Sequence, residues 1–69
     1  MRVAKVIELV GESSNGWEDA VKDAVERAST TLDDITGVEV YNLTAGIKDG
    51  KLVDYKANIK LAFGLHDPK

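Results

Sequence analysis

The sequence contains no cysteine and a single histidine in 69 residues. Without cysteine no disulfide can form, and one histidine, His66, cannot assemble a zinc site of the usual Cys/His type. A chain this short buries only about 60% of the surface that its unfolded form exposes. Natural proteins of this size often add disulfides, a metal or oligomerisation. Association with other chains is therefore the expected source of additional stability.

Long apolar runs and an excess of basic residues are also missing. No run approaches the roughly 20 residues needed to span a bilayer. The N-terminal stretch "MRVAKVIELVGE" carries charges where a signal peptide would be apolar. The net charge of −3 argues against non-specific nucleic-acid binding, which needs clustered lysine and arginine. We therefore expect a cytoplasmic protein with no nucleic-acid or membrane partner.

The clearest pattern that is present lies near the C-terminus, in "KANIKLAFGL". Apolar residues occupy every second position from Tyr55 to Leu65, and polar or small residues lie between them. A period of two predicts a β-strand with two different faces, and we place it over Lys51–Leu65. One face needs a core, in which Ile59 and Phe63 are the expected anchors, whereas the other presents Lys56, Asn58 and Lys60.

Two further elements are predicted in the first half of the chain. The β-branched run "VAKVIELV" indicates a strand over Val3–Val10. An alanine-rich apolar stripe that starts at Trp17 predicts an amphipathic helix that ends near Leu32. Trp17 begins this stripe, which favours a core or subunit-contact role. Three side chains are the alternative caps of the helix: Ser13, Ser14 or Asn15, the last together with Glu18.

The remaining strand and its turn define the topology. Val38–Lys48 is the second predicted strand, and Asp49-Gly50 is a two-residue type I′ hairpin signal. The element order is then β-α-β-β, and a right-handed crossover leaves room for the third strand between the other two. We predict one α+β domain over residues 1–69, in which a three-stranded antiparallel sheet of order 1-3-2 packs on one helix.

The two-residue turn also predicts the register if no bulge intervenes. The expected pairs are Val40 with Ile59 and Val38 with Leu61 on the core face, and Glu39 with Lys60, Tyr41 with Asn58 and Leu43 with Lys56 on the outer face, with Gly37 opposite Ala62. The outer face therefore combines an aromatic residue, a leucine and an opposed ion pair. This mixture is more typical of an interface than of a solvated surface.

Three stretches resemble the dodecin family in order and spacing: "KVIELVGESSNGWEDAVKDAVERASTTL", "GVEV" and "YKANIKLAFGL". The similarity covers nearly the whole chain. It implies a three-stranded antiparallel sheet partly wrapped around one helix. It also implies a hollow homododecamer built from trimers, and a storage role for flavin rather than an enzyme activity. The implied oligomer agrees with the expectation from the small core.

The resemblance also places a flavin site. In flavin-binding dodecins a tryptophan before the second strand stacks on the isoalloxazine ring, and a glutamine on the third strand bonds its polar edge. These positions are Gly37 and Lys56 here, and neither residue type matches, because glycine cannot stack and lysine only donates. Gly37, Tyr41 and Lys56 are the candidate binding residues, for riboflavin or FMN or for another anionic compound.

A calcium site is the alternative that the resemblance suggests, because the calcium dodecin branch also has a tryptophan at the Trp17 position and a cation near Lys56. Five carboxylates could supply oxygen ligands: Asp33, Asp34, Glu39, Asp49 and Asp54. They lack the spacing of a calcium-binding loop, and a structural explanation is preferred. In that explanation Asp33 and Asp34 end a helix, Asp49 forms a turn and Glu39 pairs with Lys60. Metal ligands therefore remain unassigned.

No nucleophile motif or acid–base pair is visible, and His66 is expected to be a surface residue. Two hypotheses follow. The chain forms either a ligand-storage shell with a pocket between subunits, or a structural shell that binds only ions such as calcium. In the first hypothesis Lys56 and Lys60 hold an anion, and in the second they neutralise Glu39 and a neighbour's carboxylate.

Overall fold

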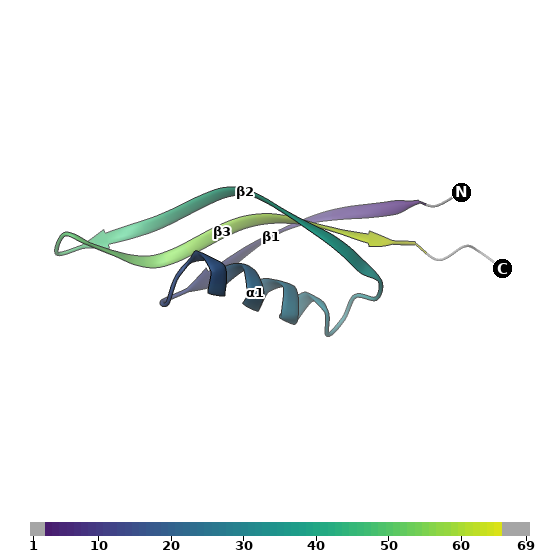
Figure 1. Ribbon diagram of the computed structural model, residues 1–69, viewed down its shortest axis with the longest axis horizontal. Helices are drawn as coiled ribbons and strands as arrows, with labels where there is room; N and C mark the ends of the chain where they lie inside the picture. Colours follow the sequence, from purple (N-terminus) through teal and green to yellow (C-terminus); the bar gives the residue numbers. More distant parts are fainter. Residues whose placement is uncertain (1–2, 66–69) are drawn as a thin grey trace.

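The computed structural model describes residues 3–65, so His66 lies outside the described residues. Four elements follow the predicted order: β1 (Ala4–Ser13), α1 (Trp17–Ala28), β2 (Ile35–Lys48) and β3 (Lys51–Gly64). They form an antiparallel sheet of order β1-β3-β2 with the helix on one face (Figure 1). The predicted α+β class and strand order are confirmed. Within residues 3–65 no helix has the length and apolar character needed to cross a membrane.

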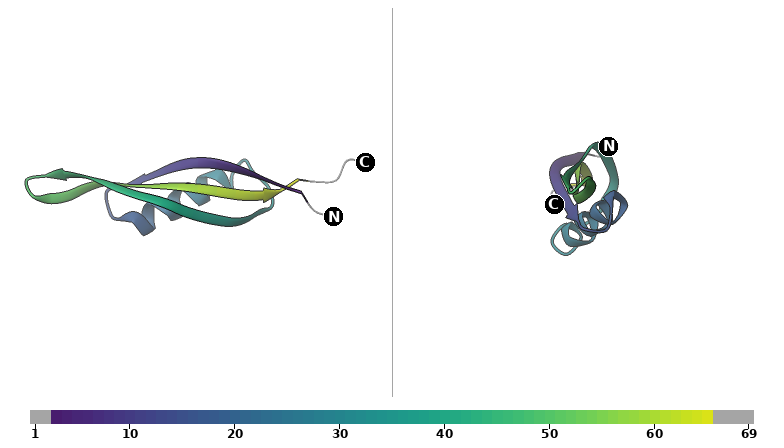
Figure 2. Two further views of the ribbon diagram at one scale, coloured as in Figure 1. Left: turned by 90° about the horizontal axis from the view of Figure 1, so that it is seen from above. Right: turned by 90° about the vertical axis from the view of Figure 1, so that its left-hand side faces the viewer.

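The molecule is long and narrow, about 57 × 20 × 12 Å (Figure 2). β1 pairs with β3 only from Ala4–Gly64 to Ser13–Tyr55, so β2 and β3 continue beyond it as a two-stranded ribbon. We call this ribbon, residues 45–54, the arm. Its turn has positive φ at Asp49 and Gly50 (53° and 75°), as a type I′ turn requires.

The core is small and lies where α1 packs on β1 and β3. It comprises five buried residues: Ala20, Ala24, Ala57, Ile59 and Leu61. The small helix residues allow a close approach to the sheet. A Cβ at Gly11 would overlap the carbonyl oxygen of Ala20 and would lie 3.0 Å from the Cβ of Ala24. Ile59 is therefore a core residue, as the strand pattern predicts, but Phe63 is only partly buried.

The helix begins at Trp17, where the predicted stripe starts, but its C-terminal end and its N-cap differ from the prediction. It ends at Ala28 instead of Leu32, because the hydroxyls of Ser29 and Thr30 donate to the carbonyls of Val25 and Arg27 (2.8 and 2.7 Å). Such local bonds compete with continuation of the helix. At its start the N-cap is Gly16, so the predicted serine or asparagine caps are wrong. The side chains of Ser13 and Asn15 instead donate to Asp19 (2.7 and 3.4 Å).

The core-face register is confirmed, but part of the outer-face register is wrong. Val40 faces Ile59 and Val38 faces Leu61, whereas Asn42 rather than Tyr41 faces Asn58. The reason is a pair of bulges: one adds a residue to β3 near Asp54, whose φ is 51°, and the other adds Tyr41 to β2. The two shifts cancel. Between them, Leu43 faces Ala57 and so lies on the helix side of the sheet, not opposite Lys56.

Candidate functional site

The face of the sheet that points away from α1, the outer face, has a hollow of about 240 Å³ next to Gly37. Its lining comes from all three strands: Val6, Gly37, Val38, Glu39, Lys60 and Ala62. Val6, Ala62 and Gly37 lie in one row across the sheet. A Cβ at Gly37 would meet no described heavy atom within 4 Å. The missing side chain therefore leaves open space above a small apolar floor, and we call this the Gly37 hollow.

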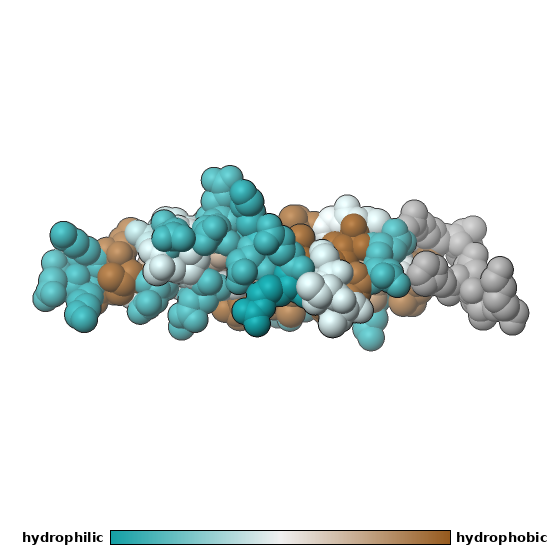
Figure 3. Space-filling view, turned by 90° about the horizontal axis from the view of Figure 1, so that it is seen from below, coloured by the Kyte–Doolittle hydropathy of each residue, from teal (hydrophilic) through white to brown (hydrophobic). Residues whose placement is uncertain are grey.

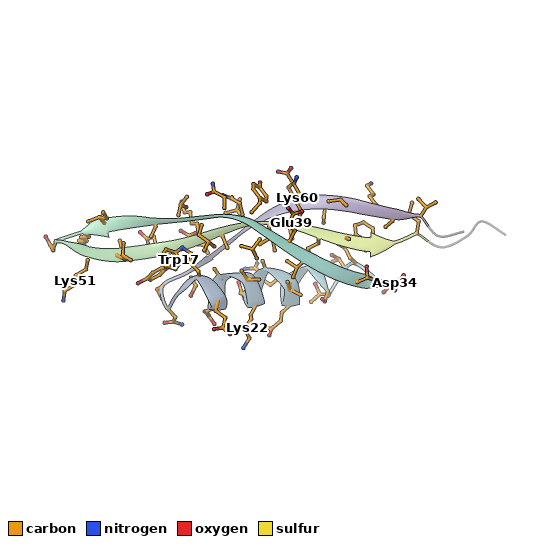
Figure 4. The ribbon with its side chains drawn as sticks, turned by 45° about the horizontal axis from the view of Figure 1, so that its top comes forward. Trp17, Lys22, Asp34, Glu39, Lys51 and Lys60 are labelled. Carbon is orange, nitrogen blue, oxygen red and sulfur yellow. The ribbon has the colours of Figure 1, made fainter. Side chains whose placement is uncertain are left out.

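A row of charged residues borders the Gly37 hollow. Lys60 on β3 lies directly between Glu8 on β1 and Glu39 on β2, and Figure 4 shows Lys60 and Glu39 side by side. Its Nζ lies 5.2 Å from the centre of the Tyr41 ring, within the range of a cation–π contact. Because both residues that face Lys60 in the ladder carry carboxylates, negative charge already lies beside it within one chain. This geometry favours neutralisation over anion binding for Lys60.

Tyr41 is the aromatic residue of this face. The bulge carries it out of the ladder, and its hydroxyl donates to Oε2 of Glu8 at 3.0 Å. This hydrogen bond is the main reason why the pKa of Tyr41 lies above the ordinary value of 10.0, with desolvation and the negative charge of Glu8 adding to it. Tyr41 thus links the two edge strands across β3.

The three predicted site residues do not meet within one chain. Tyr41 reaches the Gly37 hollow through Lys60, which lines it. Lys56, in contrast, pairs with Glu12 and Thr44 and is exposed. Lys56 is six residues along β3 from Ala62, the partner of Gly37. At about 3.3 Å per residue, this places Lys56 about 20 Å from the Gly37 hollow. Any pocket that includes both Gly37 and Lys56 therefore needs a second chain.

Trp17 lies at the base of the arm and has a structural environment. Its Nε1–H donates to the carbonyl oxygen of Thr44 at 2.8 Å. Its ring packs edge-to-face on Tyr55, with centroids 5.0 Å apart and planes at 85°. Trp17 therefore joins the start of α1 to both strands of the hairpin, and Figure 4 shows its position beneath them. The sequence indicated a packing role but not this contact with the arm.

Among residues 3–65 no three histidine, cysteine, aspartate or glutamate side chains group closely enough to hold a metal ion. Three of the candidate carboxylates belong to residues with positive φ: Asp34, Asp49 and Asp54. Asp49 forms the hairpin turn, and Asp54 marks a bulge. The carbonyl of Asp34 accepts the Gly64 N–H at 3.0 Å. A calcium site built from these carboxylates would need more than one chain.

A second concavity, which the sequence analysis did not predict, lies between α1 and β1. This α1/β1 groove has a volume of about 670 Å³ and an apolar floor that includes Ile7, Leu9, Ala24 and Ala28. Charged side chains line it as well: Glu12 from β1, and Asp23 and Arg27 from α1. The only sequence feature that pointed to this groove was the set of alanines in the helix stripe. They indicate close packing, but they do not show that the edge of β1 remains uncovered.

Comparisons with known proteins agree with one another. A family model described as Dodecin matches residues 3–66. The calcium dodecin of Mycobacterium tuberculosis is 32% identical over 63 residues, which cover 91% of this chain and 89% of that protein. A dodecin from Thermus thermophilus is 32% identical over 66 residues, 96% of each chain. The solved dodecin of Streptomyces coelicolor has a TM-score of 0.90 and 36% identity, with 97% and 96% coverage of the two chains.

Proposed function

The chain belongs to the dodecin family, and from this premise we propose that it forms a non-enzymatic shell of identical subunits that binds a small molecule between them. The observation that carries the proposal is the Gly37 hollow. Its volume of about 240 Å³ is below the roughly 300–1,000 Å³ of sites that enclose a drug-sized ligand. One chain therefore offers part of a site, which a second chain would complete. We expect the homododecamer built from trimers that the family resemblance implies.

The distribution of apolar side chains supports self-assembly. Ile59 and Leu61 are the largest side chains that are fully buried in the described chain. Exposed apolar residues occur on both faces of the sheet: Val6 and Val10 on the outer face, and Val38, Val40 and Leu43 on the helix side of β2. Soluble monomers rarely expose large contiguous apolar patches. Contact with further copies would bury these residues.

The ligand class that fits the proposed pocket is a flat ring with an anionic group, such as FMN, with riboflavin as its uncharged counterpart. Apolar Val6, Ala62 and the backbone of Gly37 would contact the ring. Lys56 of a second copy is the cation that this arrangement leaves for the anionic group. Because Gly37 provides no stacking partner, we expect wild-type binding to be weak. Stacking pairs contribute about 0.5–1.5 kcal/mol beyond burial.

Quenching of flavin fluorescence tests this proposal. The double variant Gly37→Trp/Lys56→Gln adds a stacking ring and an amide that both donates and accepts. It should gain about 2–4 kcal/mol, or about 1.5 to 3 decades of affinity, for riboflavin and FMN. The matched control, Gly37→Leu/Lys56→Gln, adds bulk without a π-face and should gain much less. No gain in the tryptophan variant would oppose a flavin site at Gly37, and tight binding by wild type would show that other residues hold the ring.

A shell that binds only ions is the second candidate, because one relative has a solved structure described as calcium-chelating with a novel calcium-binding site. That structure has a TM-score of 0.80 and 28% identity to this chain. The carboxylates would have to come from neighbouring copies, since residues 3–65 of one chain contain no suitable cluster. Calorimetric titration of the assembled protein with calcium, and with magnesium as the control, separates the candidates. Calcium binding by a colourless preparation that ignores FMN would favour the ion shell.

A further inference from the structure

The tip of the arm presents an apolar pair within a charged frame. Ile47 and Leu52 face each other across the two strands and are 75% and 50% exposed. Lys48 and Lys51 follow them toward the turn, where Asp49 adds one negative charge. Figure 3 shows the hydrophobic surface directly behind the hydrophilic tip. Because a lone two-stranded hairpin is only marginally stable in water, the arm needs further contacts.

The α1/β1 groove offers the opposite arrangement of charge on a similar apolar surface. Its floor includes Ile7, Leu9 and Ala28, and its charged residues are Glu12, Asp23 and Arg27. The tip therefore carries two cations and one anion, and the groove carries two anions and one cation. Docking would place apolar residues against apolar residues, and it would place Lys48 and Lys51 near carboxylates and Asp49 near Arg27.

The arm cannot fill the groove of its own chain. The tip lies at one end of the long axis, beyond the start of α1 (Figure 1). The groove is lined by the second half of the helix, from Asp23 to Ala28, which lies further from the tip. The pairing agrees with this view: β1 stops at Ser13, opposite Tyr55, whereas the tip pair lies further along the ribbon at Leu52. An arm that fills the groove must therefore come from another molecule.

We infer that the tip of the arm of one copy docks into the α1/β1 groove of a second copy. This inference rests on the proposed self-assembly and identifies one of its contacts. The contact is heterologous, because each copy uses a tip on one side and a groove on the other. Such contacts form rings when the rotation closes. The free edge of β1 beside the groove is covered in the same step.

Charge reversal tests the contact without changing the core. Lys51→Glu at the tip or Asp23→Lys at the groove should each raise the subunit concentration for half-assembly, measured by light scattering and native mass spectrometry. We expect a change of at least about tenfold, which corresponds to about 1.4 kcal/mol. The double variant Lys51→Glu/Asp23→Lys should recover most of the loss. Lys22→Glu is the control, because this exposed helix lysine is next to Asp23 in sequence but does not line the groove.

Ile47→Asp tests the apolar part of the contact. The side chain is largely exposed in the isolated chain, so circular dichroism should show an unchanged fold while assembly is lost. A wild type that stays monomeric would overturn both the proposed self-assembly and this contact. If the wild type assembles and the charge-reversal and Ile47 variants assemble equally well, this contact alone is overturned. Single reversals that weaken assembly without recovery in the double variant would also overturn it.

Discussion

The part of the sheet beneath α1 and the arm share two strands but are stabilised differently. Under the helix, Ala57, Ile59 and Leu61 of β3 are buried, and Gly11 allows the helix backbone to approach β1. In the arm, none of residues 45–54 is buried, and the turn and the two-stranded ladder hold the ribbon together. The same strand therefore supplies the core at one end and an exposed surface at the other.

The boundary between the two regions is local and has three components. The bulge near Asp54 interrupts the ladder, β1 ends opposite Tyr55, and Trp17 bonds to Thr44 while packing on Tyr55. Beyond this boundary an apolar residue such as Ile47 gains little from burial within its own chain. The covered part therefore supplies the burial that a subunit needs to fold, whereas the arm supplies the tip of the proposed contact between copies.

The largest expected effect on folding comes from truncating the core. Ile59→Ala should lower the free energy of unfolding by about 2–5 kcal/mol, because it removes buried methyl groups and leaves a cavity. Ile47→Ala, the same change in the arm, should cost less than about 0.5 kcal/mol in the isolated subunit. Urea unfolding followed by circular dichroism, at one fixed subunit concentration below that of half-assembly, measures both. Equal losses would contradict the division into two regions.

A second pair of variants tests backbone packing. Gly11→Ala places a methyl group against the Ala20 carbonyl, and overpacking of this kind typically costs about 1–3 kcal/mol. Gly46→Ala in the arm is the control, because its methyl group would lie at an ordinary 3.4 Å from a Val53 methyl carbon. Thermal unfolding should therefore separate the two alanine variants. A Gly11→Ala variant as stable as Gly46→Ala would mean that α1 shifts away from β1 at little cost.

Trp17→Phe should sharpen the boundary between the regions. Phenylalanine keeps a ring against Tyr55 but loses the hydrogen bond to the Thr44 carbonyl, a contribution of about 1 kcal/mol. Hydrogen exchange should speed up in residues 45–54 more than in the strands under α1. Val25→Ala is the control, because Val25 lies on α1 and packs against the core, away from the arm. Uniform acceleration in Trp17→Phe would contradict a local role at the base of the arm.

The sequence predicted the elements well because each depends on local patterns. Alternation on β3, the alanine stripe of α1 and the Asp49-Gly50 turn each indicate one structure, and the core-face register follows from the turn. The C-terminal end of the helix, its N-cap and the bulges were missed. They depend on competition between local hydrogen bonds, as at Ser29 and Thr30, and on a positive φ at Asp54 that no pattern of period two reveals.

The site was less predictable than the fold. The predicted register placed Gly37 on the outer face opposite Ala62, as observed, but the bulges moved Tyr41 out of the ladder and placed Thr44 instead of Leu43 opposite Lys56. The α1/β1 groove was missed for a different reason. Its walls come from segments far apart in the chain, and its depth depends on how far α1 covers the sheet. Contacts between copies involve residues that one chain leaves exposed, so periodicity alone does not identify them.

The smallest expected effect concerns Tyr41, whose outer-face contacts involve neither the core nor the arm. Its hydrogen bond to Glu8 raises the pKa above 10.0, so the folded state favours the protonated phenol. This contribution to stability is fully present below pH 10 and is lost as the pH rises through the raised folded-state pKa. In a Tyr55→Phe background, where Tyr41 is the only tyrosine, phenolate absorbance should show a lower pKa after Glu8→Gln. Glu12→Gln, the same change further along β1, is the control and should leave the titration unchanged. An identical titration in the Glu8 and Glu12 variants would show that Tyr41 does not bond Glu8 in solution, and the link across the outer face would be lost.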